Sequence, residues 1–83
     1  MRWELTAHAA TVLAERGIST QWVERVLSNP ERKERDRVDP QLIHALGRIA
    51  QYGDRVLRVI YNDSANPWRI VTAFFDRGER GKS

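Results

Sequence analysis

Residues 55–77, RVLRVIYNDSANPWRIVTAFFDR, form the most apolar stretch of the 83-residue chain and contain two long runs of β-type residues. Successive side chains of a strand point to opposite faces, and residues 55–61 and 68–76 can both be divided in this way. The residues between them, 62–67, include Asn, Asp, Ser and Pro, which favour a turn. Both alternating sets of the second run contain apolar residues, as is typical of an interior strand. The stretch therefore predicts an antiparallel hairpin at the centre of a sheet.

The alternation also assigns the side chains of the hairpin to faces. The first strand is predicted to place Arg55, Leu57, Val59 and Tyr61 on one face and Val56, Arg58 and Ile60 on the other. The second strand is predicted to place Trp68, Ile70, Thr72, Phe74 and Asp76 on one face, opposite Arg69, Val71, Ala73 and Phe75. A charge inside an apolar strand has to reach solvent, a carboxylate or a ligand, so we expect the hairpin to supply part of the functional site.

Two helices are predicted before the sheet. Residues 5–17 have apolar residues at helical spacing, with Thr6 as the N-cap and Gly17 just past the end. A second helix is predicted to begin after Ser19 or Thr20 and to end near Ser28, because the residue before Pro30 disfavours the helical conformation.

The middle of the chain permits two interpretations. Residues 31–39, ERKERDRVD, alternate in charge, which indicates a solvated loop or, as the alternative, an edge strand whose charges oppose aggregation. Residues 42–49, LIHALGRI, fit a helix or a strand, and Gly47 favours the strand. Residues 52–54 are predicted to form a turn.

These elements predict an α+β domain in the order ααββββ, with two N-terminal helices packed on one face of an antiparallel sheet of three or four strands. One domain is expected over residues 1–83, with an ordered core at about 3–77 and a flexible tail at 78–83. Two helices leave the far face of the sheet partly open, and Arg and His side chains on that face would make a cleft.

The composition narrows the classes of function. The net charge is +3, and all of the excess lies in residues 41–83, with seven basic and four acidic side chains. Twelve of the fourteen basic residues are Arg, which pairs with phosphate through two hydrogen bonds, although an Arg-rich composition alone gives the same numbers. Cysteine is absent and the two His residues lie far apart, so we expect no metal and no cofactor. No signal peptide or membrane span is evident, which predicts a cytoplasmic protein.

Several short segments together resemble a known family. They are His8-Ala9, Glu15-Arg16-Gly17-Ile18, Val23, Val26-Leu27, Pro30, Leu57-Arg58-Val59 and Ile70 to Arg77. Their order and spacing resemble the small bacterial domains grouped as domain of unknown function 4258, over about residues 5–77. Family members often have a second basic residue where this chain has Val12, which weakens a basic role for the first helix.

The resemblance implies a fold and a range of functions. The ααββββ plan of the family is similar to that of the RelE/ParE toxins and the broader microbial ribonuclease fold. Those proteins include metal-independent ribonucleases, some of them ribosome-dependent, and inhibitors of DNA gyrase. By this analogy we expect a function directed at RNA, with RNA, the ribosome or a small antitoxin protein as partners, and a monomer or a homodimer.

Candidate site residues follow from the chemistry of RNA cleavage. His titrates near neutrality and can move protons, and Arg can neutralise the charge that develops on phosphoryl oxygens. The catalytic candidates are His44, Arg58, Arg48 and Arg77. The candidates for RNA binding are Arg55, Tyr61 and Arg69, and Tyr61 is also a possible proton donor.

Structural roles compete with these assignments. His44 can be a half-buried strand residue that bonds a backbone carbonyl, and Arg58 can form an ion pair with Asp76 or Asp54. His8 is expected to serve in packing or capping, and to tether the first helix to the sheet together with Arg16. The leading hypothesis is a toxin-like endoribonuclease. The alternatives are a non-catalytic module that binds nucleic acid or protein through the basic sheet face, and a regulatory domain that pairs a sheet edge with a partner chain.

Overall fold

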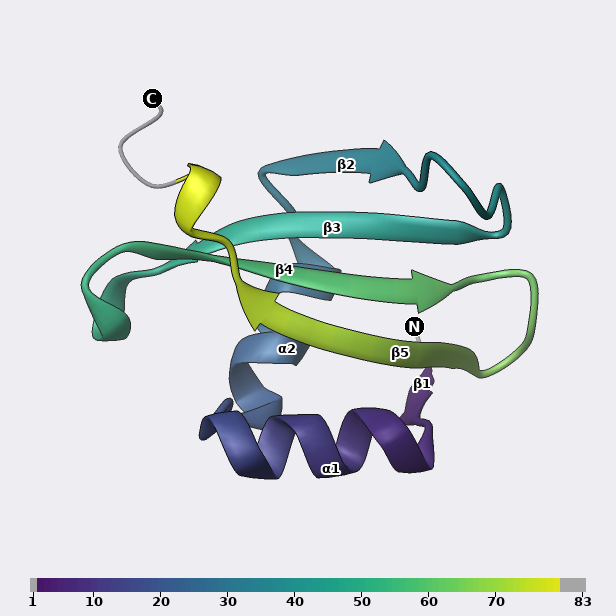
Figure 1. Cartoon of the computed structure of the whole chain (residues 1–83), viewed down its shortest axis with the longest axis horizontal. Helices are drawn as coiled ribbons and strands as arrows, with labels where there is room; N and C mark the ends of the chain where they lie inside the picture. The colour runs from purple at the N-terminus through teal and green to yellow at the C-terminus, as the bar shows by residue number, and fades with distance from the viewer. Residues whose placement is uncertain (1, 80–83) are drawn as a thin grey trace.

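A computed structural model describes residues 2–79 as a small α+β domain with two helices and a five-stranded mixed sheet (Figure 1). The elements are β1 (Trp3–Leu5), α1 (Ala7–Arg16), α2 (Thr20–Ser28), β2 (Arg32–Arg35), β3 (Leu42–Ile49), the short 3-10 helix η1 (Ala50–Tyr52), β4 (Arg55–Asn62), β5 (Trp68–Phe75) and the 3-10 helix η2 (Arg77–Glu79). The strand order is β1-β5-β4-β3-β2. β1 pairs with β5 in parallel, and the other neighbours are antiparallel.

The two predicted helices are present, with the predicted caps. The Thr6 hydroxyl accepts a hydrogen bond from the Ala9 N–H, and Gly17 adopts the left-handed conformation at the end of α1. Ser19 caps α2 by accepting from the Gln21 N–H. Arg16 Nη1 donates to the Ala73 carbonyl at 2.8 Å, so α1 is tethered to β5 as expected for this arginine, whereas the helical residue His8 is exposed.

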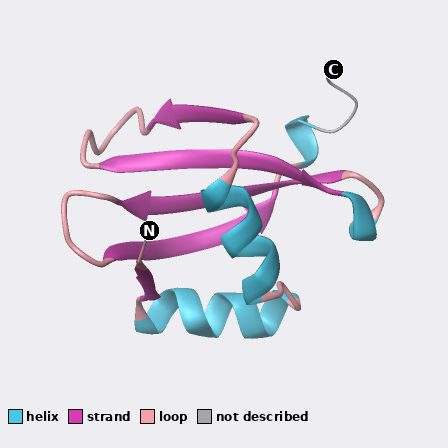
Figure 2. Cartoon of the chain, turned by 180° about the vertical axis from the view of Figure 1, so that it is seen from behind, coloured by secondary structure: helices cyan, strands magenta, loops and turns pink. Residues whose placement is uncertain are grey.

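Seen from behind, α2 crosses in front of the strands and α1 runs below them (Figure 2), whereas neither helix lies in front of the sheet in the opposite view (Figure 1). α1 packs against β5 and β1, and α2 packs against β3 and β4. The core lies between these helices and the sheet and is built from alternate residues of the central strands, among them Ala45, Leu57, Val59, Tyr61 and Ile70. A Cβ atom on Gly47 would lie 3.2 Å from Val26 Cγ2, so the missing side chain lets α2 approach β3 closely. We call the face of the sheet that packs against α1 and α2 the helix-covered face, and the opposite face the open face.

Residues 42–49 form the strand β3, so the strand interpretation is correct. Residues 32–35 form a strand at the edge of the sheet, which was the alternative to a loop. The predicted order of elements was incomplete and the purely antiparallel sheet was wrong, because β1 precedes α1 and runs parallel to β5. Three residues are too few to show a strand period, and residue 5 was assigned to the helix instead.

A bulge in β5 changes the predicted faces of that strand. Ile60 pairs with Thr72, but the next residue, Tyr61, pairs with Ile70, so Val71 is the extra residue. Ile70 therefore lies in the core, while Thr72 turns to the open face. The predicted grouping of Ile70 with Thr72 and Asp76 was wrong, since strict alternation cannot continue through an extra residue.

The predicted tail at 78–83 is only partly within the described residues. Gly78 and Glu79 belong to η2, and residues 80–83 lie outside the described part. Neither helix among residues 2–79 is long and apolar enough to cross a membrane.

Candidate functional site

His44 and Arg58 come together on the open face from adjacent strands. In the β3–β4 ladder Arg58 is opposite Leu46, two residues along from His44, so the two side chains lie diagonally on the same face. Arg58 Nη1 lies 2.8 Å from His44 Nδ1. The predicted convergence of these two residues is therefore present.

The hydrogen bonds of His44 define which ring nitrogen carries the proton. A guanidinium group has donors and no acceptor, so Nδ1 must offer its lone pair to Arg58. The other nitrogen, Nε2, lies 2.7 Å from Asp36 Oδ1 and therefore donates its proton to that carboxylate. The imidazole is thus held in one tautomer, between the carboxylate of Asp36 and the guanidinium of Arg58.

Arg58 is held by two carboxylates in addition to His44. Its Nε donates to Asp76 Oδ2 at 2.8 Å, and its Nη1 donates to Glu34 Oε1 at 2.9 Å. Among residues 2–78, Arg58 is the charged residue that is buried, with 9% of its surface exposed. Burial alone would lower the pKa of Arg58, but the hydrogen bonds and charges of Glu34 and Asp76 raise it above its ordinary value. We refer to Glu34, Asp36, His44, Arg58 and Asp76 as the Arg58 cluster.

The two acids at the sheet edge are stabilised in their ionised form. The hydrogen bond from Arg58 lowers the pKa of Glu34, and the charges of Arg58 and Arg32 add to this effect. The pKa of Asp36 is lowered first by the backbone N–H of Asp39, and then by His44 and the N–H of Val38. Asp36 therefore fixes both the start of the loop after β2 and the orientation of His44.

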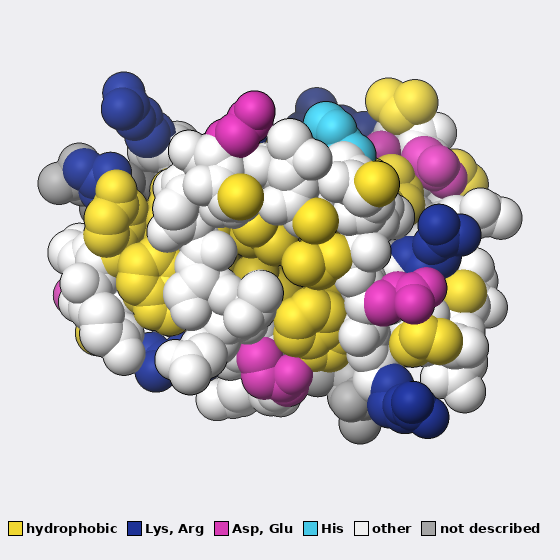
Figure 3. Space-filling model, turned by 90° about the horizontal axis from the view of Figure 1, so that it is seen from below, with side chains coloured by type: hydrophobic (Ala, Val, Ile, Leu, Met, Phe, Trp, Pro, Cys, Tyr) yellow, Lys and Arg dark blue, Asp and Glu magenta, His cyan; other side chains and the backbone are white. Residues whose placement is uncertain are grey.

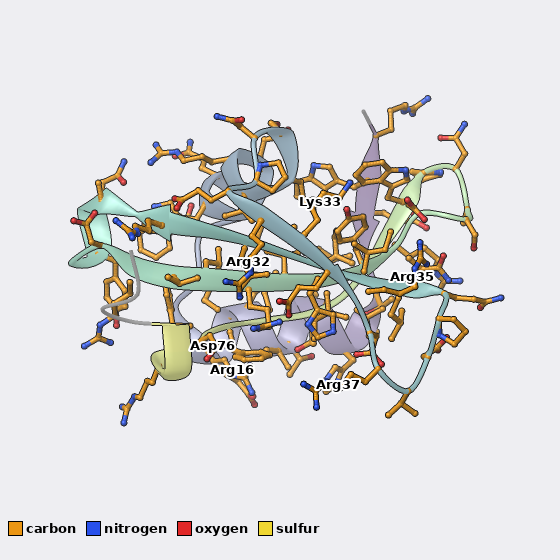
Figure 4. All side chains as sticks on the ribbon, turned by 90° about the horizontal axis from the view of Figure 1, so that it is seen from above. Arg16, Arg32, Lys33, Arg35, Arg37 and Asp76 are labelled. Atoms are coloured by element: carbon orange, nitrogen blue, oxygen red, sulfur yellow. The ribbon has the colours of Figure 1, made fainter. Side chains whose placement is uncertain are left out.

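Four members of the cluster, Glu34, Asp36, His44 and Arg58, line a pocket of about 470 Å³ on the open face. The pocket is lined by Glu34, Arg35, Asp36, Arg37, Val38, His44 and Arg58. Seen from above, with the β2 edge toward the viewer, Arg32, Arg37 and Asp76 lie on one side of β2. Lys33 lies on the other side, with α2 (Figure 4). The α1 side of the molecule differs, since apolar atoms occupy its middle and charged side chains lie mainly toward its margins (Figure 3). The open face thus carries the Arg58 cluster.

The other two catalytic candidates lie outside the cluster. Arg48 is exposed on the open face, with its Nε 3.8 Å from Glu31 Oε1, and its backbone N–H donates to the same carboxylate. Arg77 is exposed in η2 and borders a small separate pocket with Arg55, Phe75 and Asp76. Asp76, the residue before Arg77, lines this small pocket and also accepts a hydrogen bond from Arg58 Nε, so it links Arg77 to the cluster.

The three predicted RNA-binding residues do not share the open face. Tyr61 is 1% exposed, belongs to the core and stacks on Trp68 with ring centroids 5.0 Å apart. Its assignment as a base-stacking group or proton donor was wrong, because the face predicted for it is the one the helices cover. Arg55 lies over the Tyr52 ring at 4.9 Å, and Arg69 is exposed beside β1, opposite Glu4.

Three members of the cluster were not predicted as site residues. Asp76 was named only as a possible ion-pair partner of Arg58, and that pairing is confirmed at 2.8 Å. Glu34 and Asp36 lie in the charged run 31–39, where nothing in the sequence distinguishes them from solvated neighbours. The relevant signal was the edge-strand interpretation of this run, which places Glu34 opposite His44 in the sheet.

The arrangement of the cluster suits proton transfer beside an anion. An oriented imidazole next to a carboxylate can accept a proton, and a neighbouring guanidinium can neutralise a phosphoryl group. Among residues 2–79, no three His, Asp or Glu side chains are placed to hold a metal ion together. The cluster's own side chains supply acid–base and electrostatic chemistry.

Comparison with known proteins gives one match. The family model described as "Domain of unknown function (DUF4258)" matches residues 5–75. No curated protein and no solved structure matches the chain.

Proposed function

Because the chain belongs to the DUF4258 family, whose description assigns no activity, we propose from the geometry of the Arg58 cluster that the protein is a metal-independent endoribonuclease. The observation that carries the proposal is the position of His44 between Asp36 and Arg58, all three of which line the pocket. A histidine fixed by a carboxylate can act as the general base, and the adjacent guanidinium can neutralise the charge of the phosphorane. Neither function requires a metal.

The reaction is transesterification within RNA. His44 Nδ1 accepts the proton of the ribose 2′-hydroxyl, whose oxygen attacks the adjacent phosphorus, and the bond from phosphorus to the 5′-oxygen breaks. Asp36 stabilises the imidazolium that forms, and Arg58 neutralises the phosphorane. The products are a 2′,3′-cyclic phosphate and a 5′-hydroxyl: a water molecule that enters the open pocket gives a proton to the leaving 5′-oxygen and takes the proton back from the His44 imidazolium, which restores the base.

Substrate binding has to rearrange one contact in this scheme. Arg58 Nη1 occupies the lone pair of Nδ1, so a phosphate must draw the guanidinium away before the imidazole can act as a base. Glu34 is the carboxylate that a phosphate can most easily replace, because its side chain is 44% exposed and it lies on the edge strand. Asp76 is more enclosed and continues to hold Nε.

We further propose a RelE/ParE-like toxin role in a bacterial cytoplasm. This role includes RNA, free or on the ribosome, as substrate and a small antitoxin protein as partner. The antiparallel strands β2 to β5, two helices on one face and a pocket on the other support the analogy.

The decisive experiment compares two histidines in one chain. Purified wild type, His44→Gln and His8→Gln would be incubated with RNA in EDTA, with and without ribosomes. We expect wild type and His8→Gln to cleave equally, and His44→Gln to lose at least about a hundredfold in rate. His8 is exposed on α1, away from the pocket, and so reports any unspecific effect of losing a histidine.

A substrate with a single 2′-deoxy position would separate this mechanism from others, since it has no nucleophile to deprotonate. Equal cleavage by His44→Gln and wild type, or no cleavage by wild type, would contradict the catalytic proposal.

One observation favours a second candidate, a nucleic-acid-binding module without chemistry. Both ring nitrogens of His44 are already engaged, and Arg58 is already paired with carboxylates. The exposed Arg35 and Arg37 at the pocket rim would then supply the binding. Binding to intact RNA that weakens steeply with salt, with a slope reduced by about one in Arg37→Gln, would support this candidate.

A further inference from the structure

The outer edge of β2 carries backbone groups that can pair with another strand. Asp36 N–H donates to the Leu42 carbonyl at 3.0 Å, and Glu34 is opposite His44 in the β2–β3 register. Bonded residues alternate in an antiparallel ladder, so Lys33 and Arg35 direct their N–H and C=O groups away from β3. Within residues 2–79, no strand pairs with this edge.

The side chains along the edge have an unusual symmetry of charge. The sequence of residues 31–35 is Glu-Arg-Lys-Glu-Arg, and all five residues are exposed. If this segment is laid antiparallel against a copy of itself with Lys33 opposite Lys33, each Glu31 faces an Arg35 and each Arg32 faces a Glu34. Four of the five cross-strand pairs then join opposite charges, which stabilise such pairs.

We propose that β2 is a homodimerisation strand, which pairs antiparallel with β2 of a second copy in the register centred on Lys33. In this register the outward N–H and C=O groups of the two Lys33 residues bond each other reciprocally. The dimer joins the two sheets into one, with strand β2 of each copy at the junction.

The neighbouring registers that also bring outward groups together have smaller shares of opposite-charge pairs. Centring on Arg32 places Arg32 opposite Arg32 and each Glu31 opposite a Lys33. Centring on Glu34 places Glu34 opposite Glu34 and each Lys33 opposite an Arg35, and these three like-charge pairs offset the four opposite pairs of Arg32 with Asp36 and Glu31 with Arg37. Centring on Arg35 places Arg35 opposite Arg35, and each Glu34 opposite an Asp36. Charged edge strands usually oppose pairing, but the register centred on Lys33 has the largest share of opposite-charge pairs, four of five, so the pattern favours this register over the others.

The two-fold axis of this pairing is perpendicular to the sheet, which keeps even-numbered residues of both copies on the same side. The open faces of the two copies therefore become continuous, and their Arg58 clusters lie on the same face on either side of the junction. The pairing does not depend on whether the clusters are catalytic.

A disulfide test reads the register directly, because the chain contains no cysteine. In the proposed register the Cα atoms of the two Lys33 residues lie about 5.5 Å apart, within the range of about 4.4–6.8 Å that a disulfide spans. The two Arg35 residues are displaced by four positions, or about 13 Å along the strands. We expect Lys33→Cys to form a disulfide dimer under mild oxidation at least about tenfold faster than Arg35→Cys, because pairing raises its effective concentration. Equal rates would overturn the proposal.

Sedimentation of the cysteine-free chain gives an independent readout. Wild type is expected to show a concentration-dependent dimer, and Lys33→Pro to lose it, because proline removes an N–H that points outward and leaves the ladder to β3 in place. Arg35→Glu should weaken the dimer, and Glu31→Arg with Arg35→Glu should restore it. Far-UV circular dichroism would establish that the variants are folded. A wild type that stays monomeric at its highest soluble concentration would overturn the proposal, as would a dimer that Lys33→Pro leaves intact.

Discussion

The two faces of the sheet are stabilised by different interactions, apolar burial on one and hydrogen-bonded charges on the other. On the helix-covered face, residues such as Leu57, Val59 and Ile70 are fully buried, and each contributes by removing apolar surface from water. On the open face, Arg58 and its partners form a charged cluster that stays partly in contact with solvent. Folding can tolerate an unpaired charge on a surface but not in the core, so the open face is where this chain can hold reactive groups. The contrast predicts which substitutions affect stability and which affect chemistry.

Truncation in the core should have the largest effect on stability. Leu57→Ala leaves a cavity under the centre of β4 and is expected to lower the free energy of unfolding by about 2–5 kcal/mol. Ile60→Ala, three residues along on the open face, is the matched control and should cost less because Ile60 is only half-buried. Urea denaturation of both variants would measure the difference. Equal losses would show that the open face is packed as tightly as the core.

Removing the guanidinium of Arg58 should have the next largest effect. Arg58→Leu leaves the carboxylates of Glu34 and Asp76 without this partner and the Nδ1 atom of His44 without its donor. Because both carboxylates retain some access to water, we expect a loss of about 1–3 kcal/mol, less than for a fully buried pair.

A second substitution would show whether the loss of stability comes from the carboxylates that are left without a cationic partner. In Arg58→Leu with Asp76→Leu, the uncompensated carboxylate next to residue 58 is removed along with the cation, and part of the lost stability should return. The coupling between the two substitutions follows from a double-mutant cycle by urea denaturation. Additive losses would mean that the ion pair of Arg58 with Asp76 contributes little.

Much of the contrast between the faces is predictable from alternation alone. The period of residues 55–61 placed Leu57 and Val59 on a different face from Arg58, and the structure agrees. The same period placed Tyr61 with Leu57, and the structure shows that the helices cover the face on which both residues lie. The structure confirms the alternation and buries Tyr61 in the core, so the assignment of Tyr61 to an RNA site was wrong.

The partners of Arg58 were harder to predict because they depend on irregular features. The bulge at Val71 places Asp76 on the open face with Thr72, whereas strict alternation from the buried Ile70 would place it under the helices. Sequence alone does not reveal an extra residue in a strand that is apolar on both faces. The position of Glu34 opposite His44 depends on the length and turns of the loop between β2 and β3, which Asp36 stabilises through the N–H groups of Val38 and Asp39.

The smallest effect, and the most specific to the open face, is a dependence of stability on pH. Asp36 and Glu34 have folded-state pKa values below their ordinary values of 3.8 and 4.5, so the unfolded chain binds protons more readily than the folded one as the pH falls. Their stabilising contribution is complete above the ordinary pKa values and is lost as the pH falls through the lowered ones. Asp36→Asn should therefore flatten the fall in urea midpoint below about pH 4.5.

Leu57→Ala is the control for this measurement, because it removes no titratable group. It should lower the urea midpoint at every pH and leave the shape of the pH profile unchanged. If Asp36→Asn also shifts the whole profile without flattening it, the ionisation of Asp36 does not contribute to the dependence of stability on pH. The two faces would then differ in composition but not in how they respond to protons.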